Sequence, residues 1–226
     1  MVSKLELKKA VNTLIRRTTI PSRINYRRNI ADSIYEAYIF ALILKSIKKV
    51  GGVVELRSIR NPFSSPPVFI FRGSPGNIHS NSHDYGYAEF TYNGEKYEVH
   101  LDVYHEGTSG VRHEVDVSII DKEHCDNCRR NRKNPQAKHT KAIIECKFYS
   151  TTNLRTELIR TFVGLKDDMG SVYIARFCSN KDGENIRKYC SGKENRPRFN
   201  GNLVPSSEEE NRFVHVLMDD LIKWLG

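Results

Sequence analysis

The chain has 226 residues, with 36 Lys and Arg against 27 Asp and Glu, a formal net charge of +9 and a sequence pI near 9.3. The length suits one domain covering residues 1–226, and the charge favours a polyanionic partner, above all nucleic acid. The sequence has no run of about 18 apolar residues and no apolar centre of a secretory signal, so we expect a cytoplasmic protein without membrane attachment. Five cysteines, an odd number, argue against a disulfide framework.

The N-terminal half is predicted to hold two helices and a hairpin. A short amphipathic helix occupies residues 1–20 and ends at Pro21, and a strongly apolar helix begins at an Asn29 cap and stops at Gly51 and Gly52. Residues 57–84, rich in Pro, Gly, Ser and Asn, are expected to be irregular except for a short strand at "PPVFIF". Two alternating runs then meet at an Asn93-Gly94 turn, which is a strong hairpin signal.

The C-terminal half continues with alternating strands and helices. In chain order we predict a strand at 112–121, a polar basic loop, a strand at 142–149, a helix capped by Thr151 or Thr152 and running to Lys166, a strand beginning at Ser171, a polar loop at 180–205 and an amphipathic helix at 206–225. The helix between the last two strands implies a parallel pair, whereas the hairpins imply antiparallel pairs. The predicted fold is therefore an α/β domain with a mixed sheet.

Acidic residues interrupt two otherwise apolar strands. "EVD" ends at Asp116, and "ECK" contains Glu145 and Lys147. Alternation places Val115, Val117 and Ile119 on one face of the first strand and Glu114 with Asp116 on the other. If the two strands adjoin, Asp116, Glu145 and the backbone carbonyl of Cys146 can hold Mg²⁺ or Mn²⁺, while Lys147 orients or deprotonates the attacking water and stabilises charge on a phosphate.

These motifs resemble those of the PD-(D/E)XK nuclease superfamily, which has the restriction-endonuclease-like fold. "EVD" matches the acidic motif without its literal proline, "ECK" matches the (D/E)XK tripeptide, and the α-β-β-β-α-β core of that family corresponds to about residues 29–179. Some members add a glutamate from the first core helix, a position that Glu36 matches. The residue pattern independently supports Glu36 as a site residue, because a carboxylate on an apolar helix face needs a partner or a metal.

The resemblance implies a Mg²⁺-dependent endonuclease that cuts duplex DNA in restriction, anti-phage defence or DNA repair and recombination. Cutting both strands generally needs two active sites, so a homodimer or higher homo-oligomer is expected. Two other functions stay open: an RNase on the same fold, and a non-catalytic nucleic-acid-binding module.

The basic stretch between the two acidic strands has two further interpretations. Its cations are expected to contact phosphates, and they are Arg129, Arg130, Arg132, Lys133, Lys138 and Lys141. Its C-x2-C spacing, with a histidine on either side, suggests a zinc site, although one pair alone is a weak signal; the residues are His124, Cys125, Cys128 and His139. His100 and Asp102, which belong to no recognisable motif, are expected to lie on a strand surface.

Overall fold

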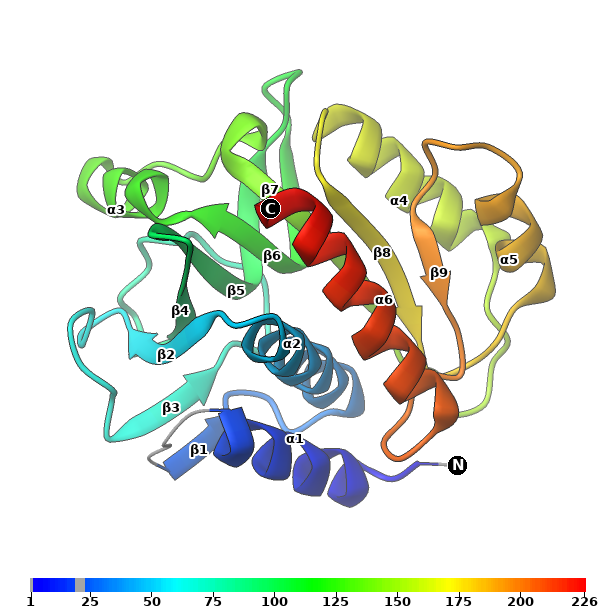
Figure 1. Cartoon of the computed structure of the whole chain (residues 1–226), viewed down its shortest axis with the longest axis horizontal. Coiled ribbons are helices and arrows are strands. Elements are labelled where there is room, and N and C mark those ends of the chain that lie inside the picture. The colour runs from blue at the N-terminus through cyan, green and yellow to red at the C-terminus, as the bar shows by residue number, and fades with distance from the viewer. Residues whose placement is uncertain (1, 19–22) are drawn as a thin grey trace.

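A seven-stranded mixed sheet with helices on both faces forms the centre of the protein, and the computed structural model describes residues 2–18 and 23–226 (Figure 1). Within those residues the helices are α1 Lys4–Thr18, α2 Ala31–Lys49, α3 Lys122–Asn131, the 3-10 helix η1 Ala137–His139, α4 Thr156–Asp168, α5 Glu184–Ser191 and α6 Glu208–Leu225. The strands are β1 Arg23–Tyr26, β2 Val53–Ser58, β3 Val68–Phe71, β4 Gly86–Tyr92, β5 Glu95–Glu106, β6 Arg112–Asp121, β7 Thr140–Lys147, β8 Ile174–Ser179 and β9 Arg198–Asn200.

The strand order of the large sheet is β2-β4-β5-β6-β7-β8-β9. Neighbours from β2 to β7 are antiparallel, and β7, β8 and β9 run parallel to one another. The predicted hairpin turn is confirmed, because Asn93 and Gly94 both have positive φ, 48° and 85°, as a tight turn of this type requires. The predicted mixed α/β class and the parallel β7–β8 pair are likewise confirmed.

Two apolar clusters hold the helices on opposite faces of the sheet. The larger cluster joins α1, α2 and α6 to the sheet, and α2 buries residues around almost its whole circumference. The smaller cluster joins α4 and α5 to the other face through residues such as Phe162, Phe177 and Ile186. Figure 1 shows α2 and α6 side by side in front of the sheet. Because α2 is buried in this way, the backbone at Glu36 is held in a fixed position.

Several predicted boundaries are wrong by a few residues. The N-cap of α2 is Ile30 rather than Asn29, and that of α4 is Arg155 rather than Thr151 or Thr152, in both cases without a side-chain cap hydrogen bond. The first helix ends at Thr18, and Pro21 lies outside the described residues. The strand predicted at 142–149 begins and ends two residues earlier. Polar cap candidates compete along these loops, and packing selects the residue at which each helix begins.

Six elements within the described residues were not predicted at all: β1, β2, α3, η1, α5 and β9. The basic loop after β6 is the helix α3, the polar loop at 180–205 contains α5 and β9, and β2 precedes the segment predicted to be irregular. The short strand at "PPVFIF" exists as β3, but it pairs in parallel with β1 in a separate two-stranded sheet. Short polar helices carry a weak periodic signal, because only two or three of their positions face the core.

Candidate functional site

Three carboxylates from three elements converge where β5 and β6 lie beside α2. Oxygen atoms of Glu36, Asp102 and Asp116 lie within 4.8 Å of one another. Asp102 in β5 and Asp116 in β6 stand opposite each other, between the pairs Leu101–Val117 and Val103–Val115. Helix α2 brings Glu36 from the side. Asp102 and Asp116 are buried, so their charges are only weakly screened by water.

The alternation of β5 and β6 breaks at these two aspartates. Val117 packs in the cluster with α2, but Val115 packs in the cluster with α4, so the predicted common face of Val115, Val117 and Ile119 is wrong. Asp102 has φ of 50°, a left-handed conformation that is uncommon for a residue within a strand. The change of face turns Asp116 inward, whereas its predicted neighbour Glu114 is exposed and stands outside the group of three carboxylates.

A carboxylate and an ammonium group, both from the end of β7, also lie close to Asp116. Lys147 Nζ lies 2.5 Å from Glu145 Oε1 and 3.5 Å from Asp116 Oδ2. The backbone N–H of Cys146 donates a hydrogen bond to Asp116 Oδ2 at 2.7 Å. Asp116 therefore contacts both groups: its carboxylate lies within 4.8 Å of those of Glu36 and Asp102, and within 3.5 Å of the ammonium of Lys147, which pairs with Glu145.

This geometry modifies the predicted metal set. The structure brings Asp116 and Glu36 together as expected, but the third carboxylate of the group is Asp102, while Glu145 pairs with Lys147. The backbone N–H of Cys146 contacts Asp116, and the role of its carbonyl as a metal ligand stays a prediction. Asp102 was assigned to a strand surface, and that assignment is wrong. The only sequence signal for Asp102 was that it lies two residues after His100 in an alternating strand. That spacing does not reveal that the strand changes its face at Asp102.

Burial and mutual repulsion raise the pKa of the carboxyl groups. Burial first, and then Asp102 and Asp116, raise the pKa of Glu36 to about 10. Burial and then the charge of Asp116 raise the pKa of Asp102 to about 7 and that of Glu145 to about 7. Burial alone would lower the pKa of Lys147, but Asp116 and Glu145 outweigh it and raise that pKa, so Lys147 stays an ammonium ion at neutral pH.

The carboxylate group fits a hard divalent cation. Asp102 Oδ2 is buried and accepts no hydrogen bond from any residue that the structure describes, although a buried carboxylate oxygen normally has a partner. Three carboxylates contribute only oxygen ligands, which suits Mg²⁺ or Mn²⁺ rather than a metal that prefers sulfur. Glu36, Asp102 and Asp116 are thus the residues that can hold such an ion.

The basic segment between β6 and β7 divides into exposed and buried cations. Arg130, Arg132, Lys133 and Lys138 are exposed around the end of α3 and the start of η1. Lys141 lies 3.0 Å from Asp121 Oδ2 and is partly covered. Four of the six predicted phosphate contacts therefore face solvent.

Arg129 has a different position from the one predicted. Its two terminal nitrogens donate to both oxygens of the fully buried Glu98, at 2.8 and 2.6 Å, and one of them also donates to Asp126 at 2.6 Å. His100 Nε2 lies 2.7 Å from the same Glu98 carboxylate, so His100 is also an interior residue. This bidentate pair attaches α3 to β5 and leaves Arg129 without a free edge for a phosphate.

The structure does not gather the four predicted zinc ligands. Cys125 and Cys128 are buried in a small apolar cluster, and burial raises the pKa of both thiols. His124 Nε2 accepts the N–H of Gln136 at 3.0 Å, and the ring of His124 stacks on that of His139. In residues 2–18 and 23–226 no three of these four side chains bring ligand atoms within 4.8 Å of one another. The C-x2-C spacing is here the inner face of a helix.

Comparison of the chain with protein-family models, with curated proteins and with solved structures finds no match in any of the three. Within the described part of the chain, none of the helices is both long enough and apolar enough to cross a membrane.

Proposed function

We propose that this protein is a Mg²⁺- or Mn²⁺-dependent endonuclease that hydrolyses phosphodiester bonds, with duplex DNA as its substrate. One observation carries the proposal: Asp116 belongs to a group of three carboxylates able to hold a cation and also lies 3.5 Å from Lys147, which pairs with Glu145. The acidic residues come from β5, β6, β7 and α2, so the fold itself brings them together. The resemblance of "EVD" and "ECK" to nuclease motifs supports the same chemistry.

Each residue has a role that its geometry supports. Glu36, Asp102 and Asp116 would hold the cation, which when bound supplies Lewis-acid polarisation of the phosphate and a lowered pKa for water. Lys147 carries its charge at neutral pH, so it is suited to orient water and to stabilise negative charge on the attacked phosphate rather than to accept a proton. Glu145 holds the Lys147 ammonium through their 2.5 Å contact.

The exposed cations support a nucleic-acid substrate. Helix α3 and η1 connect β6 to β7, the two strands that carry Asp116 and Glu145. Arg130, Arg132 and Lys133 belong to the connection that leaves β6 at Asp121 and enters β7 at Thr140, where they can contact the phosphates of a bound nucleic acid. Two copies of the chain would supply one site for each strand of a duplex, which sedimentation of the DNA complex tests.

A plasmid-cleavage assay with and without Mg²⁺ tests the proposal. We expect Glu145→Ala and Lys147→Ala each to reduce Mg²⁺-dependent cutting by about 100-fold or more, the scale of a lost catalytic group. Glu123→Ala, which removes an exposed glutamate of α3, is the matched control and should cut like the wild type. Undiminished cutting by both site variants would contradict the assignment.

The same samples separate the two alternative functions. A parallel RNA substrate that is cut while DNA is not would identify an RNase. Salt-sensitive binding of DNA without any cleavage, unchanged by Glu145→Ala, would identify a non-catalytic binding module.

A further inference from the structure

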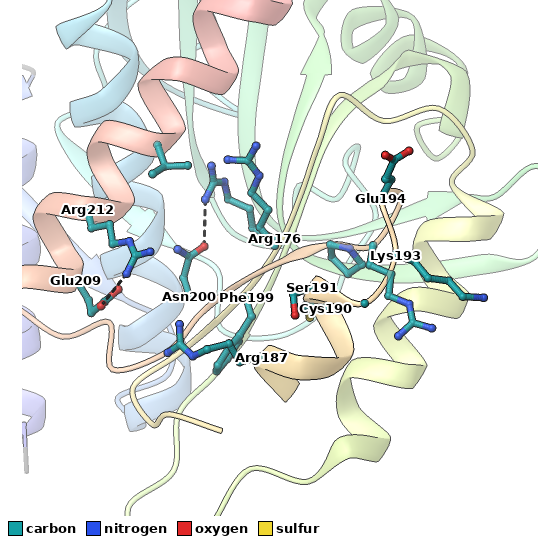
Figure 2. A pocket seen from close by; sticks show the side chains of 15 residues that line it. Arg176, Arg187, Cys190, Ser191, Lys193, Glu194, Phe199, Asn200, Glu209 and Arg212 are labelled. Atoms are coloured by element: carbon teal, nitrogen blue, oxygen red, sulfur yellow. Dashed lines mark hydrogen bonds and ion pairs between the residues drawn. The ribbon is translucent and has the colours of Figure 1, made fainter. Parts of the chain in front are cut away.

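A pocket remote in the chain from the carboxylates has five arginines among its fifteen lining residues. It lies between α5, β9 and α6 and has a volume of about 620 Å³ (Figure 2). Its lining shares no residue with the acidic site. Six lining residues are cationic and two are acidic; the cations are Arg176, Arg187, Lys193, Arg196, Arg198 and Arg212, and the acids are Glu194 and Glu209. So many cations in one concavity repel one another unless an anion joins them.

Carboxylates around the pocket neutralise only some of this charge. Arg176 and Arg198 share one carboxylate, that of Asp220, at 2.5 and 3.4 Å. Arg187 pairs with Asp182 at 2.7 Å, and Arg212 pairs with Glu209 at 3.6 Å.

The remaining cations of the pocket have no such partner. Neither Lys193 nor Arg196 forms an ion pair within the part of the chain that the structure describes. The pocket therefore has an excess of positive charge, because Lys193 and Arg196 have no ion-pair partner among the described residues and because Arg176 and Arg198 share the single carboxylate of Asp220.

Aromatic rings and backbone hold two of the arginines in place before any ligand arrives. The Arg196 guanidinium lies 3.7 Å from the centre of the Tyr189 ring and donates to the Tyr189 carbonyl at 2.6 Å. The Arg187 guanidinium lies over Phe199, which itself lines the pocket. A stacked guanidinium is held in one orientation, so it loses little side-chain entropy when its remaining N–H groups bind an anion.

Arg176, which lines the pocket, has a buried donor without a partner among the described residues. Arg176 is completely buried, and its terminal nitrogens donate to Asn200 Oδ1 and Asp220 Oδ2. Its Nε–H is buried without a partner among the described residues. Such donors are uncommon in folded proteins, because leaving one unpaired costs the loss of its hydration.

We propose that this pocket binds a small phosphate-bearing ligand of about the size of a nucleotide. Its volume falls in the range of small-molecule sites, about 300–1,000 Å³. Paired guanidinium donors match phosphate oxygens in geometry and in charge, and Phe199 with Val216 offers an apolar side to the remainder of the ligand. Because the pocket shares no residue with the acidic site, this proposal goes beyond the proposed nuclease and stands or falls separately.

Titration calorimetry in EDTA, where no divalent ion supports cleavage, tests the proposal with inorganic pyrophosphate, ADP and adenosine. We expect pyrophosphate and ADP to bind the wild type and adenosine not to bind. The double variant Lys193→Glu with Arg198→Glu should weaken binding of both by about tenfold or more, the scale of one lost charge-assisted hydrogen bond. Arg196→Ala should weaken it in the same direction.

Lys188→Glu is the matched control. Lys188 is on α5 beside the pocket, its side chain is 72% exposed, and it does not line the pocket, so this variant should bind like the wild type. Thermal unfolding checks that every variant is folded. Absence of pyrophosphate and ADP binding, or equal binding by the pocket variants, would overturn the proposal. The proposal would also be overturned if the pocket variants weakened the binding of a 12-nucleotide single-stranded DNA but of neither pyrophosphate nor ADP. That result would identify the pocket as a nucleic-acid contact.

Discussion

At the scale of single residues, Asp102 shows how a site differs from its motifs. The motifs identify Asp116, Glu145 and Lys147, and the apolar face of the first long helix identifies Glu36. Asp102 belongs to no motif, yet it is buried opposite Asp116 with an unpartnered oxygen. Its left-handed backbone and its repulsion by Asp116 both cost free energy in the folded state. Such a cost is typical of a functional site.

Asp102→Asn should therefore stabilise the protein when no divalent ion is present. Burial and Asp116 raise the pKa of Asp102 to about 7, so at pH 8 its folded-state charge is unfavourable. Asparagine removes the charge and tolerates positive φ, and we expect a gain of about 1 kcal/mol, or about 2–4 °C in Tm. Thermal unfolding at pH 8 with EDTA measures this.

Addition of Mg²⁺ provides the second half of that test. Mg²⁺ should raise the Tm of the wild type and have a much smaller effect on Asp102→Asn, because a ligand stabilises only the state that binds it. Asp219→Asn changes an exposed acid of α6 and should respond like the wild type. Equal Mg²⁺ stabilisation of Asp102→Asn and the wild type would remove Asp102 from the cation site.

At the scale of elements, α3 turns a basic stretch into a helix with two different faces. Cys125, Cys128 and Arg129 face inward, and Arg130 faces solvent. The side chain of Arg129 is only 15% exposed, and Glu98 beneath it is fully buried. Arg129 and Arg130 are adjacent in the sequence but have different surroundings. The number of charges in the sequence cannot distinguish the buried arginine from the exposed one.

Arg129 and Arg130 should respond oppositely to substitution. Arg129→Met leaves Glu98 short of its bidentate partner, so we expect a loss of about 3 kcal/mol in the free energy of unfolding, measured in urea. Arg130→Ala should leave stability within about 0.5 kcal/mol and weaken DNA binding with a smaller salt dependence. A stable Arg129→Met variant with weakened DNA binding would instead support the original prediction of a phosphate contact.

At the scale of the whole molecule, His105 connects three strands of the sheet interior. It is completely buried in β5, and its two ring nitrogens lie 3.1 Å from Ser118 Oγ in β6 and 3.0 Å from Thr140 Oγ1 in β7. Burial, and then the neighbouring His100, His124 and His113, lower its pKa to about 3. The folded protein therefore keeps this ring neutral over the whole physiological range.

This lowered pKa predicts how stability depends on pH. Below its ordinary pKa of about 6.5, the unfolded state binds a proton that the folded state refuses, so stability falls as pH decreases from about 6.5 toward 3. This one group contributes up to about 1.4 kcal/mol per pH unit. Urea unfolding between pH 4 and 7 should show a shallower pH dependence for His105→Gln than for the wild type. Parallel curves would exclude His105 as a source of the acid sensitivity.

Local pattern in the sequence was enough for the main elements and for four of the five residues of the candidate site. Alternation, the Asn93-Gly94 turn and the buried helix determined the hairpins, the mixed sheet and the placement of Glu36, because each depends on residues close together in the chain. The motifs "EVD" and "ECK" indicated Asp116, Glu145 and Lys147, because each motif also consists of residues close together in the chain. Only the tertiary structure decided that the pleat breaks at Asp102, that Arg129 faces Glu98, and that α5, β9 and α6 enclose an arginine pocket. Those features depend on contacts between residues far apart in the chain, and such contacts leave no periodic signal in the sequence.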